Sequence, residues 1–280
     1  MQTRKPKQPT QQQDPPTKPK PAIVVVRPKP DSDPETKAIP DPETAEAKPE
    51  ESAIFQAVGL IIGDVTFEEE KAFIAIGEKQ YPLFYSPSHK KAFEALKLNV
   101  KRTNPTQRLL VYPRIIHFPK GKPHQTGFQV VGFEGKSGDL QNVGLEDFEF
   151  TLCGLWQFIP VSKTPCISVF KNFTPERLAY IKEAPSDRKL KYMKASHIPV
   201  FWKDAPVKPF RFNPKLEKEQ QEQVWFVGIK ARFLPLRDVF GFVSLKIPPA
   251  VKPPKYLKAS KQDKVEGRRV QTTKPKERAS

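Results

Sequence analysis

The chain has 280 residues, a hydrophobic fraction of 37% and a formal net charge of +17. This length accommodates one or two domains, and the hydrophobic fraction lies below the roughly 45–50% of an ordinary globular domain. No stretch approaches the roughly 18 consecutive apolar residues of a helical membrane span, and no apolar run near the N-terminus is long enough for a secretory signal. We therefore expect a soluble, cytoplasmic protein.

Residues 1–52 contain 12 of the 32 prolines and no aromatic residue. Such a segment cannot bury enough apolar surface to offset its chain entropy, so we predict a disordered, Pro-rich tail. Residues 1–30 carry a net charge of +6 and residues 31–52 a net charge of −6. The basic piece could fold back on the acidic piece, or the whole tail could be an inert spacer.

Residues 53–133 contain the clearest pattern, which predicts three strands, one helix and two further strands. Ser86-Pro87-Ser88 is a helix-start signal, and the apolar residues that follow it recur at helical spacing. The predicted strands cover residues 54–65, 72–76, 81–85, 108–117 and 127–133. A helix between the third and fourth of five strands is the order of the OB-fold, a small Greek-key barrel.

A glycine-containing segment, residues 134–147, is the predicted linker to a second, diverged OB-like barrel at residues 148–247. The stretch Phe55–Leu60 has the same Phe-x-x-x-Gly-Leu pattern as Phe150–Leu155, offset by 95 residues. Val131-Gly132 resembles Val227-Gly228 at an offset of 96. These matches, and the shared order of elements, favour a tandem repeat.

The second unit departs from the pattern of the first. Strands are predicted at 149–158, 165–170, 198–202, 208–212, 224–234 and 239–247, with a helix at 176–182 and a polar helical piece at 214–223. Thr174 is the expected N-cap of the first helix, with Pro175 behind it. Only two strands precede this helix, so either the third strand is displaced or the barrel is elaborated. Residues 248–280 are predicted to form a disordered basic tail.

The predicted fold is therefore mainly β, with two OB-fold-like barrels in tandem, each carrying one short helix, flanked by disordered tails. Over residues 53–247 this arrangement resembles tandem OB-fold proteins of the single-stranded DNA-binding and replication-protein type. The resemblance implies a curved strand face that stacks bases on aromatic side chains, and loops that close over the nucleic-acid backbone. The basic C-terminus departs from the acidic C-terminal tip that many such proteins use for partners.

The positive charge is concentrated in the second half of the chain. Residues 53–147 carry 12 basic and 10 acidic side chains, residues 148–245 carry 16 and 9, and residues 246–280 carry 11 and 3. A bias of this kind favours polyanionic partners, with nucleic acid first and an anionic membrane surface second.

Binding of single-stranded nucleic acid requires cations along a groove and flat aromatic faces beside them. In the first unit, the loop at 117–124 joins the fourth and fifth strands and suits a phosphate contact, although a solvated hairpin tip is the alternative. Its candidate residues are Lys120, Lys122 and His124. In the second unit, the candidates outside the predicted hairpin are Lys171, Arg188, Lys189, Lys191, Tyr192, Lys194 and Arg211.

Alternation along residues 225–232 predicts a core face and a binding face. Trp225, Val227, Ile229 and Ala231 form the expected core face. Phe226, Lys230 and Arg232 lie on the other face together with Gly228, which would allow a ligand to approach closely. The alternative for each aromatic residue in this unit is that it fills the barrel.

Catalysis, metal binding and cofactor binding find no support in the sequence. The four histidines do not pair at metal-ligand spacing, and no phosphate-cradling glycine loop or nucleophile elbow is present. Cys153 and Cys166 lie in apolar runs and are expected to be small buried side chains. We expect a non-catalytic protein that binds nucleic acid, preferably single-stranded DNA or RNA. The alternatives are a protein-interaction or assembly factor, and an accessory subunit of an enzyme.

Overall fold

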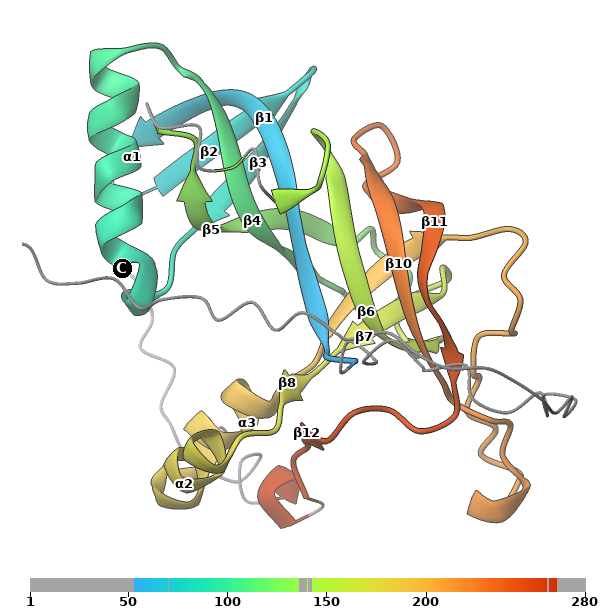
Figure 1. The fold of residues 1–280 in the computed structure, drawn as a ribbon. Coiled ribbons are helices and arrows are strands. Elements are labelled where there is room, and N and C mark those ends of the chain that lie inside the picture. The colour runs from blue at the N-terminus through green and yellow to red at the C-terminus, as the bar shows by residue number, and fades with distance from the viewer. Residues whose placement is uncertain (1–52, 70, 136–139, 141–142, 261, 266–280) are drawn as a thin grey trace, which may run out of the picture. The chain divides into compact units, whose positions relative to one another are not determined.

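The computed structural model describes residues 53–69, 71–135, 140, 143–260 and 262–265. The predicted N-terminal tail, residues 1–52, and residues 266–280 of the predicted C-terminal tail lie outside this part of the chain. The described part is mainly β (Figure 1). None of its helices has the length and apolar character needed to cross a bilayer.

The first five strands and their helix lie where the sequence predicts them, with strand ends displaced by no more than three residues. They are β1 (Gln56–Glu68), β2 (Lys71–Ile76), β3 (Lys79–Phe84), η1 (Pro87–His89), α1 (Lys90–Arg102), β4 (Thr106–Ile116) and β5 (Gln125–Phe133). The helix buries Phe93 and Leu96, two of the apolar residues whose spacing predicts it.

These five strands form a closed barrel, which we call the first barrel. The pairings run β1–β2–β3–β5–β4 and return from β4 to β1, and only the β3–β5 pair is parallel. The long strand β1 passes from one partner to the next along its 13 residues. The backbone of β2 comes close to Gly63 of β1. A side chain at this position would collide with the carbonyl oxygen of Ala75, so glycine is required.

The later strands form a second closed set of pairings, which we call the second circuit. Its strands are β6 (Glu149–Gln157), β7 (Cys166–Val169), β9 (Ser196–Phe201), β10 (Trp225–Leu234) and β11 (Val239–Ala250). The pairings run β6–β7–β9–β11–β10 and return from β10 to β6, with β9–β11 parallel. The third strand of the circuit, β9, follows both helices of this half, which agrees with the first of the two alternatives, a displaced third strand.

The remaining elements of the second half are short. They are β8 (Lys171–Asn172), α2 (Pro175–Glu183), α3 (Ser186–Met193), η3 (Lys218–Gln220) and β12 (Tyr256–Leu257). The predicted cap of α2 is present, since the hydroxyl oxygen of Thr174 accepts a hydrogen bond from the backbone N–H of Arg177 at 3.2 Å.

Three predictions for this half are wrong. Residues 208–212 form no strand, because they contribute only one bridge, between Phe210 and Gln157 at the end of β6. The predicted helical piece at 214–223 is only the single turn η3. Helix α3, which contains most of the basic residues at 188–194, was not predicted. The expected tail also begins too early at residue 248, since β11 continues to Ala250 and β12 follows it.

The proposed internal repeat aligns only at its first strand. Phe150–Leu155 begins the second circuit much as Phe55–Leu60 begins the first barrel, and the two stretches pair with each other, with Gly59 opposite Phe150. The other correspondences are wrong, because Val131-Gly132 lies in the fifth strand of its barrel and Val227-Gly228 in the fourth strand of its circuit. The helices also differ, since α1 follows the third strand and α2 the second.

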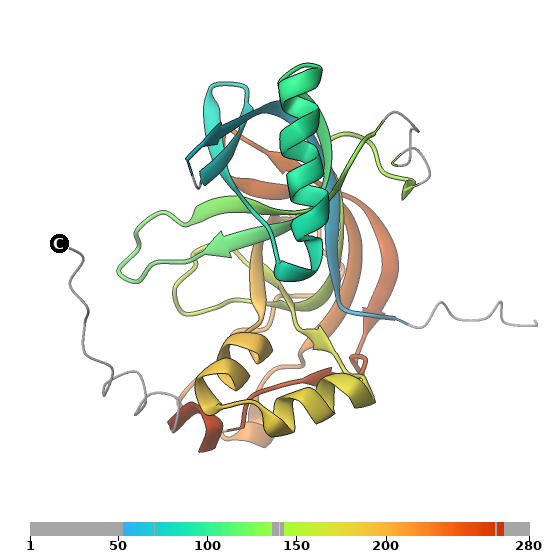
Figure 2. The same cartoon turned by 90° about the vertical axis from the view of Figure 1, so that its left-hand side faces the viewer.

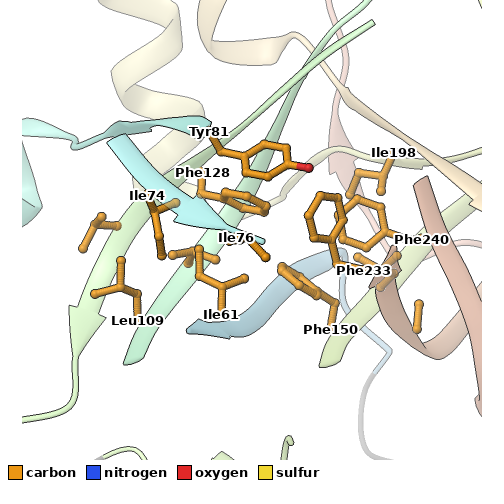
Figure 3. Close-up of a cluster of buried hydrophobic side chains, with 14 of the residues drawn as sticks. Ile61, Ile74, Ile76, Tyr81, Leu109, Phe128, Phe150, Ile198, Phe233 and Phe240 are labelled. Atoms are coloured by element: carbon orange, nitrogen blue, oxygen red, sulfur yellow. The ribbon is translucent and has the colours of Figure 1, made fainter. Parts of the chain in front are cut away.

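One hydrophobic cluster runs through both sets of strands (Figure 3). Phe233 of β10 packs against Tyr81 of β3 and Phe128 of β5, with ring centroids 5.4 and 5.3 Å apart. Phe150 of β6 packs edge-on against Phe240 of β11 at 4.9 Å. The first barrel and the second circuit are therefore packed together through a shared aromatic core.

Polar contacts join the same two sets at the turn between β10 and β11. The Tyr81 hydroxyl donates to a carboxylate oxygen of Asp238 at 2.9 Å and lies 3.1 Å from the carbonyl oxygen of Pro235. Lys79 forms an ion pair with Asp238 at 3.0 Å. Burial raises the pKa of Tyr81, and the hydrogen bond to Asp238 raises it further, so the hydroxyl keeps its proton.

Candidate functional site

The predicted binding face of β10 is covered, which corrects one expectation from the sequence. Phe226 is fully buried in a second cluster with Phe55 and Leu155, and its ring lies 5.2 Å from that of Phe55. The space beside Gly228 is filled by the side chain of Ile247 from β11. Phe226 therefore has no open face for a base, because the residues before β1 and the end of β11 cover it.

The two cations on that face are engaged by carboxylates. Lys230 forms an ion pair with Glu149 at 3.1 Å, and Arg232 forms ion pairs with Glu146 at 2.8 Å and Glu149 at 3.5 Å. Burial raises the pKa of Glu149, but the N–H of Glu146 and the charge of Lys230 outweigh it, so the pKa is lowered overall. These cations stabilise an ionised carboxylate and are poorly placed to bind phosphate.

The loop between β4 and β5 contacts the second circuit through one of its three candidate residues. Lys120 and Lys122 are exposed at its tip. The imidazole Nε2 of His124 lies 2.6 Å from the carbonyl oxygen of Asp238, where it donates a hydrogen bond to the β10–β11 turn. The loop is therefore both an exposed hairpin tip and a contact between the two sets of strands.

Arg211 lies in the irregular segment between β9 and β10. Its guanidinium group stacks over the ring of Phe158 at 4.1 Å from the centroid. A surface hollow of about 550 Å³ adjoins this pair, and the exposed ring of Phe212 also lines it. Stacking of this kind is a cation–π contact, which leaves part of the guanidinium edge available to solvent.

Helix α3 presents the basic run predicted from the sequence. Its end packs inward through Met193, which is buried with Ile181 of α2 and Leu257 of β12. Of the other predicted residues of this region, Lys189 and Tyr192 are partly buried, and the rest are exposed: Lys171, Arg188, Lys191 and Lys194. The Nζ atom of Lys171 lies 5.8 Å from the centre of the Tyr192 ring.

A groove of about 740 Å³ lies beside α3, on an outer face of the second circuit that is lined by Leu155 and Gln157 of β6 and by His197 of β9. Alternation along β6 directs Trp156 into the core and leaves Leu155 and Gln157 on this outer face. The groove is also lined by Phe170 and Phe210, which lie at the ends of neighbouring segments. Figures 1 and 2 show α2 and α3 beside the C-terminal segment, which forms another wall.

The C-terminal wall is held in place by backbone and aromatic contacts. Strand β12 pairs with β8, and the N–H of Phe173 donates to the carbonyl oxygen of Lys255 at 3.0 Å. The ring of Tyr256 packs against Phe170 and Phe55, with centroids 4.6 and 5.1 Å away. The segment that follows β11 is thus a structural part of the groove rather than a tail.

Charged side chains around the groove are of one sign. Lys194 comes from the end of α3, whereas Lys258 and Lys264 come from the C-terminal wall. No carboxylate is among the described residues that line it. An anion that enters this groove meets three ammonium groups and several aromatic faces.

A chain of hydrogen bonds crosses the floor of the groove. The amide Nε2 of Gln157 donates to the hydroxyl oxygen of Ser168 at 2.8 Å, and that oxygen lies 2.7 Å from Nδ1 of His197. Burial lowers the pKa of His197 to about 4, and the nearby charges of His117 and Lys194 contribute. The His197 ring is therefore neutral near pH 7.

Three of the four histidines approach one another here, which the sequence spacing does not predict. The His117 ring lies 5.6 Å from His124 and 6.5 Å from His197. Burial lowers the pKa of His117, despite its hydrogen bond to the backbone carbonyl of His197 at 2.8 Å. No group of metal-ligating side chains among the described residues is arranged to hold an ion.

Of the residues predicted from the sequence, only Lys194 lines the groove itself, although Lys171 and Tyr192 lie close to it. The residues that sequence reasoning missed come from five separate segments: Gln157, Phe170, His197, Phe210, Tyr256, Lys258 and Lys264. The run Phe170-Lys171-Asn172-Phe173 gave a signal for one of these segments, because it combines aromatic and basic residues between a strand and a helix.

Comparisons of the chain with known protein families, characterised proteins and solved structures found no match.

Proposed function

We propose that this protein is a non-catalytic binding protein for single-stranded nucleic acid, and that the groove beside α3 is the binding site. The first barrel and the second circuit serve as two OB-like units in tandem, of which the second carries the ligand. The strand order supports this interpretation, because each set runs first–second–third–fifth–fourth and returns to the first.

The observation that carries the proposal is the position of the groove together with its chemistry. It is lined by Gln157 of the first strand of the circuit, β6, and by His197 of the third strand, β9, and Ser168 of the second strand, β7, is hydrogen-bonded to both. OB-folds bind oligonucleotides on the face of their second and third strands, so the groove adjoins that face. Aromatic rings on which bases stack and lysines that neutralise phosphates are the two components of single-strand binding. Phe170, Phe210 and Tyr256 supply the rings, and three lysines supply the charge.

The groove also has a suitable size. Small-molecule and nucleotide sites have volumes of about 300–1,000 Å³, and 740 Å³ lies within this range. A strand longer than the groove would continue along the cations of α3, of which Lys191 is exposed and Lys189 is partly buried.

The test is a fluorescence-anisotropy titration of the full chain with labelled single-stranded DNA and RNA at two salt concentrations. The variant Lys194→Ala/Lys258→Ala removes two exposed cations of the groove. Each lost phosphate contact reduces the salt slope by about 0.7 for a single strand, so we expect the slope to fall by roughly 1.4 and the affinity to fall most at low salt.

The matched control is Lys120→Ala/Lys122→Ala, which removes the same charge from the exposed β4–β5 loop. It should change the affinity and the salt slope less than the groove variant does. If the loop variant loses binding and the groove variant does not, the site is in the loop. If the wild-type chain binds neither DNA nor RNA at low salt, the proposal is wrong, and a protein-interaction role becomes the better explanation of the two barrels.

A further inference from the structure

We infer that Gln157 and His197 contact the edge of a nucleobase and so determine which bases the groove prefers. This inference rests on the function proposed above, and it concerns base preference rather than binding as such. Both side chains line the groove, and the hydrogen-bond chain between them fixes which polar atom each one presents to a ligand.

The direction of the chain follows from Ser168, which is fully buried at 0% exposure. Its hydroxyl oxygen accepts a hydrogen bond from Gln157, because an amide nitrogen can only donate. The hydroxyl hydrogen must then find an acceptor, since a buried donor without one is costly. Among the described residues the acceptor within reach is Nδ1 of His197.

If Nδ1 accepts, the single proton of the neutral His197 ring lies on Nε2. The low pKa of about 4 agrees with a ring that carries only one proton near pH 7. No hydrogen bond from this Nε2 to another described residue is present in the structure. His197 therefore offers an N–H donor to the groove, fixed in its tautomer by Ser168.

Gln157 offers the complementary group. One N–H of its amide group is used by Ser168, which leaves the second N–H and the amide oxygen, an acceptor, on the same floor. A nucleobase presents acceptors next to donors along its hydrogen-bonding edges, and proteins that recognise single strands bind those edges. A phosphate group has acceptors only, so it can accept from His197 but leaves the amide oxygen of Gln157 without a donor.

The groove thus has two kinds of contact with different consequences. Lys194, Lys258 and Lys264 are suited to phosphates, which position a strand without reading its sequence. Gln157 and His197 are suited to base edges, which carry sequence information. Removing the second kind should therefore change the preference among bases while leaving the charge-dependent affinity in place.

Two substitutions of His197 separate the contact of Nδ1 with Ser168 from the contact of Nε2 with a base. His197→Asn keeps a short side-chain acceptor near the Nδ1 position for Ser168 and has no group at the Nε2 position. His197→Gln extends an amide nitrogen toward the Nε2 position and gives up the acceptor near Nδ1. As a second test at the other end of the hydrogen-bond chain, Gln157→Met keeps the length of the side chain and removes both its acceptor and its bond to Ser168, which orients His197.

The experiment measures anisotropy titrations with fluorescent dA, dC and dT strands of about 12 nucleotides and with an abasic strand of the same length, all at one salt concentration. The wild-type chain should prefer at least one base over the others and over the abasic strand. His197→Asn and Gln157→Met should reduce this preference by roughly 2- to 10-fold, as expected for one hydrogen bond. His197→Gln should retain it, and all three variants should bind the abasic strand as the wild type does.

The outcomes that overturn the inference differ from those that overturn the proposed function. Equal wild-type affinity for dA, dC, dT and the abasic strand refutes base reading and leaves single-strand binding intact. The same refutation follows if His197→Asn and Gln157→Met both keep the wild-type preference. Absence of wild-type binding to every strand refutes the proposed function itself.

Discussion

The first barrel and the second circuit have the same strand order but cover their cores in different ways. In the first barrel, helix α1 lies between the third and fourth strands and buries Phe93 and Leu96 against the strands. In the second circuit, the connection between the third and fourth strands is the irregular segment 202–224, and Trp202 and Val207 of that segment pack on the core.

Because the irregular segment covers the core of the second circuit, its helices α2 and α3 pack elsewhere. Helices α2 and α3 follow the second strand instead of the third, and they pack with the C-terminal segment through Ile181, Met193 and Leu257. The result is a groove beside α3 that is lined by residues of β6, β9 and the C-terminal segment. A closed set of strands thus tolerates different connections, provided that each core remains covered, and the position of the helices decides where a groove forms.

The largest expected effect tests whether an irregular segment covers a core as effectively as a helix does. Trp202 is 9% exposed, and its ring stacks on Phe242 at 4.6 Å and lies 5.6 Å from Trp156. Trp202→Ala should lower the free energy of unfolding by about 3–5 kcal/mol, because it leaves a large cavity. Urea denaturation measures this loss.

The comparison for that variant is Leu96→Ala in α1, which should cost about 2–5 kcal/mol by the same mechanism. If Trp202→Ala costs less than about 1 kcal/mol while Leu96→Ala costs the full amount, the irregular segment does not cover the core in the way described.

The next effect is a pH dependence of the folding stability, and it arises from His197 in the second circuit. The folded state holds the pKa of His197 at about 4, whereas an unfolded His titrates near 6.5, so below pH 6.5 the unfolded chain binds more protons. The stability that His197 contributes is complete above pH 6.5 and is lost as the pH falls toward 4. At about 1.4 kcal/mol per pKa unit, the loss approaches about 3 kcal/mol, and His117 acts in the same direction.

Thermal melts between pH 7.5 and pH 4 measure this dependence, and His197→Asn should flatten it. The carboxylate Glu149 has a lowered pKa, so its own contribution is lost only at lower pH. An unchanged slope in His197→Asn would show that His197 is not held neutral by the fold.

A smaller effect measures the contact between the two sets of strands. Tyr81→Phe removes only the hydroxyl that donates to Asp238 and lies near the carbonyl oxygen of Pro235. We expect a loss of about 1–2 kcal/mol in the free energy of unfolding, because Asp238 then lacks one of its partners. The double variant with Lys79→Ala should lose less than the sum of the single losses, since both residues bind the same carboxylate. Strict additivity would contradict a shared contact.

The smallest effect compares a cation that is held in salt bridges with a cation that lines the groove. Arg232 is paired with Glu146 and Glu149 and is 48% exposed, so Arg232→Ala should cost less than about 1 kcal/mol of stability and leave nucleic-acid affinity nearly unchanged. Lys194→Ala removes a cation of the groove and should weaken binding at low salt. Equal losses of affinity in the two variants would show that net charge alone governs binding.

The first barrel could be predicted closely from the sequence because its signals are local. The Gly77-Glu78 turn, the helix start at Ser86-Pro87-Ser88 and the alternating apolar residues each specify one element within a few residues of chain. The second circuit was harder to predict, because its third strand follows two helices and residues 208–212 form a single bridge in place of a strand. The alternation at 225–232 correctly identified the core side of β10, but alternation says nothing about what covers the opposite side.

Sequence by itself determined the strand content, the order of elements in the first barrel and the concentration of positive charge in the second half of the chain. Tertiary structure alone decided the site. Phe55 precedes β1 and Ile247 lies near the end of β11, and together they bury the face where Phe226 and Gly228 lie. The groove needs residues more than 100 positions apart, from Leu155 to Lys264, and their proximity depends on strand pairing and on the docking of β12 against β8. Periodicity and composition describe neighbours along the chain, whereas a binding groove is made by side chains that only the closed sheet brings together.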